Sequence, residues 1–74
     1  MQNTIYVGVV IERGQALESA IALAAAAYRR RFELEPNVAR VNPADLAPVA
    51  VAGIAVEADP WVRRRDVLVG QEVR

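Results

Sequence analysis

The longest hydrophobic pattern in the chain has the spacing of an α-helix. Between Gly14 and Glu35, apolar side chains recur at intervals of three and four residues and gather on one face. Pro36 disfavours helical geometry at Glu35 and so marks the end of this helix, whereas its start offers only Gly14 as a cap. The apolar face is expected to form the core with Leu17, Ala20, Ile21, Ala24, Ala27, Tyr28 and Phe32.

The segment before the helix, residues 4–12, alternates with the two-residue period of a β-strand. One face is wholly apolar, and the other face is half apolar. The first face carries Ile5, Val7, Val9 and Ile11, and the second carries Tyr6, Gly8, Val10 and Glu12. A strand whose second face is also partly apolar is typical of a central position or of cover on both sides, so we predict one of these two for it.

The segments after the helix predict shorter elements. Residues 37–42 form a strand that places Val38 and Arg40 on the face opposite Ala39 and Val41. Asn42 and Pro43 are typical of a helix cap and a first helical residue, which predicts one helical turn over residues 44–47.

The last third of the chain predicts two more strands. Residues 49–58 form the first, with a bulge or bend at Gly53, and residues 61–69 return after a turn at Asp59 and Pro60. Within the returning segment, residues 63–66 are either a hairpin tip or an exposed edge, and residues 67–69 are the final strand. Residues 70–74 are expected to fray.

Together these elements predict a single domain over residues 1–74. Its fold class is α+β with two layers, one long helix packed on a small mixed β-sheet of three to four strands. The strand–helix–strand unit predicts two parallel strands, and the final two strands predict an antiparallel hairpin.

A chain of 74 residues can build only a small core. Domains of this size bury only about 60% of their unfolded surface and usually gain stability from disulfides, a metal or a second chain. The sequence contains no cysteine and no histidine, which removes disulfides and the commonest transition-metal ligands. Because 54% of the residues are nevertheless hydrophobic, we predict a homo-oligomer, most simply a dimer.

The predicted helix has a second, thinly polar face that suits such an assembly. Ser19, Ala22 and Ala26 lie on it, opposite the core face. These three residues are one predicted oligomer interface, and the edge of the β-sheet is the other. The leading hypothesis is a non-enzymatic interaction or structural module that acts as a homo-oligomer.

Few residues suit catalysis. Without histidine, cysteine or lysine, the usual general base, thiol nucleophile and Schiff-base amine are missing. Glu57, Asp59 and Asp66 could converge as oxygen ligands for Mg²⁺ or Ca²⁺, but Asp59 is also typical of a turn, and Asp66 can neutralise the adjacent arginines. We predict no enzyme, no catalytic residue, no metal and no cofactor.

Two arginine triplets and Trp61 indicate an alternative function as an accessory nucleic-acid-binding protein. If the triplets met, they would form a phosphate-binding patch on which Trp61 could stack a base. The residues concerned are Arg29, Arg30, Arg31, Trp61, Arg63, Arg64 and Arg65. The plainer interpretation is a solvated surface in which Arg29–Glu33 and Arg31–Glu35 form helical ion pairs and Trp61 covers the sheet edge.

The overall charge favours the plainer interpretation. All nine basic residues are arginine, and nine acidic residues balance them. A net charge of zero provides no long-range attraction to nucleic acid or to an anionic membrane. No signal-peptide pattern is present, and no apolar run approaches the ~20 residues that span a bilayer, so we predict a cytoplasmic protein.

The abundance of arginine, alanine, valine, glycine and proline indicates a GC-rich bacterial or phage genome. The run FELEPNVARVNPADL, followed by GIAV, resembles small bacterial and phage reading frames. That resemblance includes no specific motif and implies no function.

Overall fold

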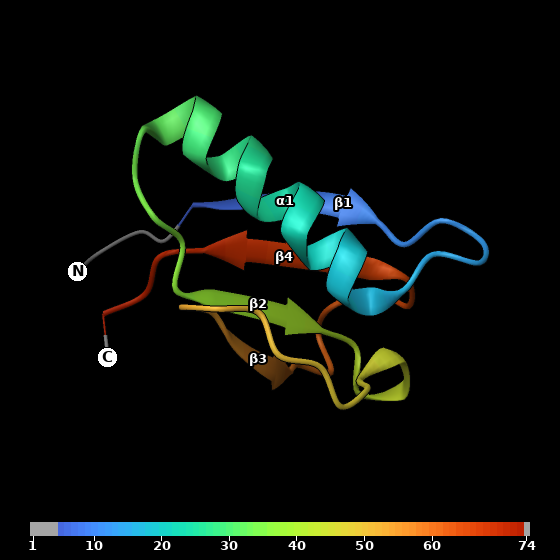
Figure 1. Ribbon diagram of the computed structural model, residues 1–74. Coiled ribbons are helices and arrows are strands. Elements are labelled where there is room, and N and C mark those ends of the chain that lie inside the picture. The colour runs from blue at the N-terminus through green and yellow to red at the C-terminus, as the bar shows by residue number, and fades with distance from the viewer. Residues whose placement is uncertain (1–4, 74) are drawn as a thin grey trace.

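The computed structural model describes residues 5–73 and shows one helix packed on one face of a four-stranded mixed β-sheet (Figure 1). This arrangement confirms the predicted α+β fold with two layers. In chain order the elements are β1 (Tyr6–Val10), α1 (Leu17–Phe32), β2 (Val38–Val41), the 3₁₀ helix η1 (Pro43–Asp45), β3 (Ala55–Ala58) and β4 (Asp66–Gly70). Within the described residues, no helix is long and apolar enough to cross a membrane.

The strand order in the sheet is β1-β4-β2-β3, so β4 lies between β1 and β2 (Figure 1). β4 pairs antiparallel with both neighbours, which makes β1 and β2 parallel to each other, as predicted for the strand–helix–strand unit. β3 pairs with β2 in parallel. The predicted hairpin of the last two strands is therefore wrong, and so is the central position of the first strand, because β1 lies at an edge.

The connection between β3 and β4 explains both differences. At its start the Asp59 N–H donates to the Val41 C=O at 2.7 Å, and at its end the Arg65 C=O accepts from the Ile11 N–H at 2.7 Å. The connection therefore passes the end of β2 and brings the chain beside β1, where β4 begins. Periodicity specifies the two faces of a strand but not its neighbours, so the sequence pattern does not reveal this crossing.

α1 is shorter than predicted at both ends. Gly14 adopts a φ of 80° in the turn before the helix, and Ala16 is the N-cap, without a side-chain hydrogen bond. At the other end Glu33 adopts the left-handed conformation, and its N–H donates to the Arg29 C=O at 2.8 Å. The helix thus has 16 residues and a length of about 24 Å, and it ends ahead of Pro36.

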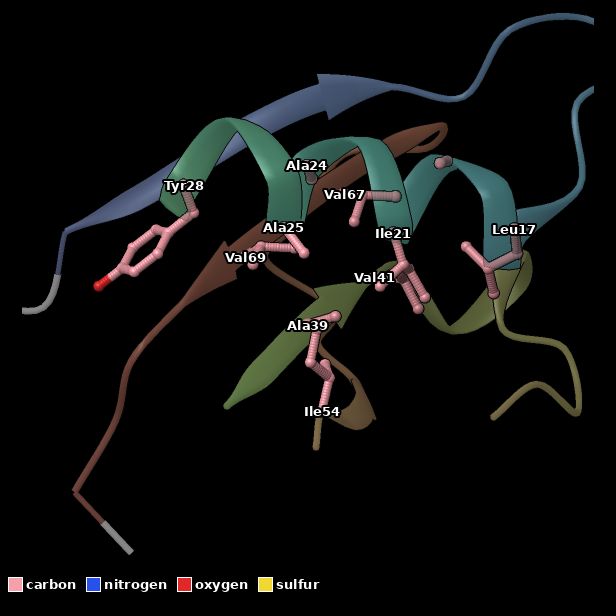
Figure 2. Packing of buried hydrophobic residues seen from close by; sticks show 11 residues of the cluster. Leu17, Ile21, Ala24, Ala25, Tyr28, Ala39, Val41, Ile54, Val67 and Val69 are labelled. Carbon is pink, nitrogen blue, oxygen red and sulfur yellow. The ribbon is translucent and has the colours of Figure 1, made fainter. Parts of the chain in front are cut away.

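The core lies between α1 and the face of the sheet that α1 covers. Figure 2 shows Ile21 pointing from α1 toward Val41 of β2, and both side chains are fully buried. Ala27 was predicted to be a core residue, but Ala25 is buried instead. The sheet extends toward β2 and β3 under the side of the helix that carries Ala25, whereas Ala27 lies over the edge formed by β1. The buried residues of α1 are Leu17, Ala20, Ile21, Ala24, Ala25 and Tyr28.

The connection between β2 and β3 is less regular than predicted. The Asn42 side chain accepts a hydrogen bond from the Ala44 N–H at 2.9 Å, which confirms the predicted cap, but the turn it begins is the 3₁₀ helix η1. The predicted strand over residues 49–58 is reduced to β3. Gly53, with a φ of 78°, forms a tight turn that pairs Val51 with Ile54, and this turn confirms the predicted bend.

Candidate interaction surfaces

The two arginine triplets lie at opposite ends of the molecule. Residues 29–31 form the last turn of α1, beside the start of β1. Residues 63–65 precede β4 at the other end of the sheet, where the Arg65 C=O accepts from the Ile11 N–H just after β1. These two ends are separated by about the length of α1, which is about 24 Å. The triplets therefore do not meet in one phosphate-binding patch.

Carboxylates neutralise the second triplet locally. Arg63 Nε lies 3.3 Å from Asp66 Oδ2, which confirms the predicted neutralisation, and Arg64 Nη2 lies 3.0 Å from Asp45 Oδ1. The Arg65 backbone N–H also donates to Asp45, at 2.5 Å. This hydrogen bond, together with the Arg64 side chain, holds the pKa of Asp45 below its ordinary value.

Trp61 is exposed to solvent over 92% of its surface, on a turn that is held by hydrogen bonds to Asp59. Asp59 Oδ1 accepts a hydrogen bond from the Trp61 N–H at 2.9 Å, and the Val62 N–H donates to the Asp59 C=O at 3.1 Å. Val62 is buried next to it. The prediction that Trp61 covers the sheet edge is wrong, because the turn that begins at Asp59 buries Val62 and leaves the indole outside.

The first triplet forms other contacts than the predicted helical pairs. Arg29 Nε lies 2.8 Å from Glu35 Oε2, because Glu33 leaves the helix in the left-handed conformation and Glu35 lies beyond the end of α1. The Arg31 guanidinium carbon lies 5.6 Å from the centre of the Phe32 ring. Arg30 and Arg31 face a groove at the edge of the sheet.

This groove, which we call the β1 groove, follows the outer side of β1. Residues 5–8 form one wall, and Ala27, Arg30 and Arg31 of α1 form the other. Among the described strands β1 pairs with β4 alone, so one row of its backbone N–H and C=O groups faces this side. β1 itself carries no charged residue and no proline.

Three large apolar side chains of β1, of the residue before it and of α1 are exposed. The exposed fractions are 61% for Ile5, 58% for Val10 and 59% for Leu23. Leu23 lies one helical turn before Ala27, so it continues the wall of the β1 groove along α1. The predicted interface residues Ser19, Ala22 and Ala26 are exposed on the outer face of the same helix.

A polar cluster that the sequence-based predictions do not include lies on the open face of the sheet, opposite α1. Arg40 Nε and Nη2 each donate to one oxygen of Glu72, both at 2.8 Å. The same guanidinium lies 3.3 Å from Glu57 and 3.8 Å from Asp59, and the Tyr6 hydroxyl donates to Glu72. Burial and the hydrogen bond to Glu72 raise the pKa of Tyr6, and the Glu72 carboxylate raises the pKa of Arg40.

This cluster fixes a segment that was predicted to fray. The Glu72 N–H donates to Asn37 Oδ1 at 2.8 Å, and Asn37 Nδ2 donates to the Glu72 C=O at 2.7 Å. The fraying prediction is wrong for residues 70–72, and residue 74 lies outside the described residues. The available signal was Arg40, a charged residue between Ala39 and Val41 in a strand, but its partner Glu72 is 32 positions away in the sequence.

The carboxylates considered as metal ligands are bound to arginines instead. Glu57 and Asp59 lie beside Arg40, and Asp66 lies beside Arg63. In residues 5–73, no group of three or more histidine, cysteine, aspartate or glutamate side chains is arranged to hold a metal ion.

Comparisons of the chain with protein-family models, with curated proteins and with solved structures find no match.

Proposed function

We propose that this protein is a non-enzymatic interaction module that works by self-association, as a homodimer. The observation that carries the proposal is the side of the molecule formed by β1 and the adjoining flank of α1. There an uncharged edge strand and the exposed side chain of Ile5 line one groove, and the exposed side chains of Leu23 on α1 and Val10 on β1 lie close to this edge. Proteins that remain monomeric usually protect an open strand edge with charge, proline or cover.

The sequence pattern of β1 supports the same proposal. Its residues are largely apolar on both faces, as in a central strand, although β1 has one neighbouring strand in the described sheet. A second copy paired with β1 would supply the missing neighbour. The strand would then occupy the position that its sequence predicts.

The size of the core gives an independent reason. The chain has a mass of 8.1 kDa, and four of the thirteen buried hydrophobic residues in its described part are alanines. Small domains without disulfides or metals commonly gain the remaining stability from a partner chain. Burial of the apolar side chains along β1 and α1 would add hydrophobic area without enlarging the domain.

Light scattering after gel filtration at micromolar concentration tests the proposal, and we expect twice the chain mass of 8.1 kDa. Leu23→Glu should yield monomers because it places a charge in the contact, whereas Ala22→Glu, on the outer face, should leave the dimer intact. Dissociation by Ala22→Glu or Ala26→Glu would instead support the outer helix face. A monomer with a high melting temperature would refute self-association.

A second candidate function, binding of single-stranded nucleic acid, is favoured by the exposure of Trp61. Aromatic side chains stack on unpaired bases, and arginines contact the backbone of the strand. Trp61 is 92% exposed, and the nearby Arg63 side chain is 88% exposed. Against this function, Asp45 and Asp66 neutralise the neighbouring arginines.

The protein contains one tryptophan, so its fluorescence reports directly on this second function. A single-stranded oligonucleotide should quench the tryptophan fluorescence at low salt. The fluorescence should recover at high salt, because salt weakens the binding. Replacement of Arg63, Arg64 and Arg65 by alanine should remove the quenching. Fluorescence that does not change at low salt would exclude nucleic-acid binding through Trp61.

A further inference from the structure

We infer that two copies of the chain join edge to edge through β1, antiparallel about a twofold axis at Gly8, with α1 of each copy packing beside the other. This inference rests on the proposed self-association and specifies its geometry. The product is one eight-stranded sheet, twice the four strands of the single chain, with both helices on the same face.

The backbone of β1 determines which groups are available for the pairing. The Ile11 N–H donates to the Arg65 C=O, so the backbone groups of Ile11 point toward the β4 side. Because hydrogen-bonded pairs alternate along an antiparallel ladder, Val9 and Val7 also bond toward β4. The N–H and C=O groups of Tyr6, Gly8 and Val10 therefore point to the open side.

These outward groups are self-complementary. With Gly8 opposite Gly8 of the second copy, Tyr6 faces Val10 across the joint in both directions, and roughly six hydrogen bonds form. The glycine at the axis adds no side chain where the two copies approach each other. A shift of the register by one residue would place the inward-facing groups of one strand against the outward-facing groups of the other, so this register is favoured over its neighbours.

The position of α1 fits the same arrangement. α1 packs on both β1 and β4 (Figure 1), so its axis lies inside the sheet edge. Neighbouring strands are about 4.8 Å apart, so a helix axis midway between β1 and β4 would lie about 10 Å from the helix axis of the second copy. Packed helices are about 8–10 Å apart. Leu23 of each copy would then enter the β1 groove of the other, against Ala27 and the stems of Arg30 and Arg31.

An interface large enough for a stable dimer must include both the strand β1 and the flank of α1. A standard interface buries about 800 Å² on each partner, which is about one sixth of the molecular surface of 5031 Å². The strand alone, about 17 Å long, offers too narrow a strip to reach this area. The strand together with the flank of α1 presents both layers of the domain and brings Leu23 into the contact.

Charge complementarity selects the antiparallel direction. Arg30 and Arg31 lie at the start of β1, and Glu12 lies just beyond its end. Antiparallel pairing brings Glu12 of one copy toward Arg30 and Arg31 of the other, whereas parallel pairing would bring the arginines of both copies together. A twofold contact uses the β1 edge of both copies, so the assembly closes as a dimer.

Val10→Pro is the sharpest variant, because it removes an outward N–H without removing a hydrogen bond to β4, and Val10→Thr is its matched control. In sedimentation velocity, we expect Val10→Pro to raise the dimer dissociation constant at least about tenfold and Val10→Thr to leave it unchanged. Both variants should retain the wild-type circular dichroism.

A second measurement on the wild-type protein does not depend on the folding of any variant. The amide protons of Tyr6, Gly8 and Val10 should exchange slowly at concentrations where the dimer forms and rapidly after dilution to the monomer, whereas those of Val7 and Val9 should stay protected. If the wild type is dimeric but Val10→Pro dimerises equally well, or exchange does not depend on concentration, the edge geometry is overturned and self-association stands. A wild type that is monomeric throughout overturns both.

Discussion

On the face of the sheet that α1 covers, Val41, Val67 and Val69 are completely buried among apolar neighbours. On the opposite face of the same strands, Arg40 lies among carboxylates, and its side chain retains an exposed fraction of 25%. One face is thus stabilised by the area it removes from water, and the other by paired charges at the surface. Because these contributions have different origins, different changes should weaken them.

The largest effect is expected from the covered face. Ile21→Ala should lower the free energy of unfolding by about 3 kcal/mol, because Ile21 is fully buried and a small core relaxes little around a cavity. Urea denaturation measures this loss, and Ser19→Ala, an exposed change in the same helix, is the control. A loss below about 1 kcal/mol would show that the core is loosely packed.

A smaller effect is expected on the open face. Arg40→Met should lower the free energy of unfolding by about 2 kcal/mol, because it leaves Glu72, Glu57 and Asp59 close together without their shared cation. Adding Glu72→Met to Arg40→Met should restore part of the loss, since one of the carboxylates is then absent. Strict additivity of the two changes in urea denaturation would contradict coupling between these side chains.

The smallest effect should appear with pH and should be confined to the charged contacts. The pKa of Asp45 is lower in the folded protein than in the unfolded chain. Asp45 therefore contributes to the free energy of unfolding at pH values above its unfolded pKa of about 4, and this contribution is lost as the pH falls through its folded pKa. The free energy of unfolding should therefore decrease from pH 5 toward pH 2. Asp45→Asn should make this decrease shallower, while Ile21→Ala should leave its slope unchanged; equal slopes for all three proteins would contradict the role of Asp45.

The two faces also differ in how far the sequence predicts them. The covered face follows from local periodicity, which correctly identifies Leu17, Ala20, Ile21 and Tyr28 as core residues of α1. The cap at Asn42 is equally local and is also predicted. Such features depend on residues a few positions apart, so the pattern along the chain contains them.

The open face depends on contacts between distant positions. Arg40 meets Glu72 because β4 enters the sheet beside β2, and no periodicity within either segment indicates that neighbour. The edge position of β1 has the same origin, since β4 separates it from β2. The exposure of Trp61 was missed for a different reason, because an isolated aromatic residue next to a turn is compatible with either burial or exposure.

The central position of β4 has a consequence for synthesis of the protein. β1 and β2 do not touch as sheet neighbours, and the strand that joins them comes after both in the chain. On the ribosome, β1, α1 and β2 would therefore emerge without a sheet to join, and a helix of 16 residues is only marginally stable alone. Folding should begin only once residue 70 has left the exit tunnel and should then proceed in a single step, which protease digestion of ribosome-bound chains with C-terminal extensions of increasing length can show.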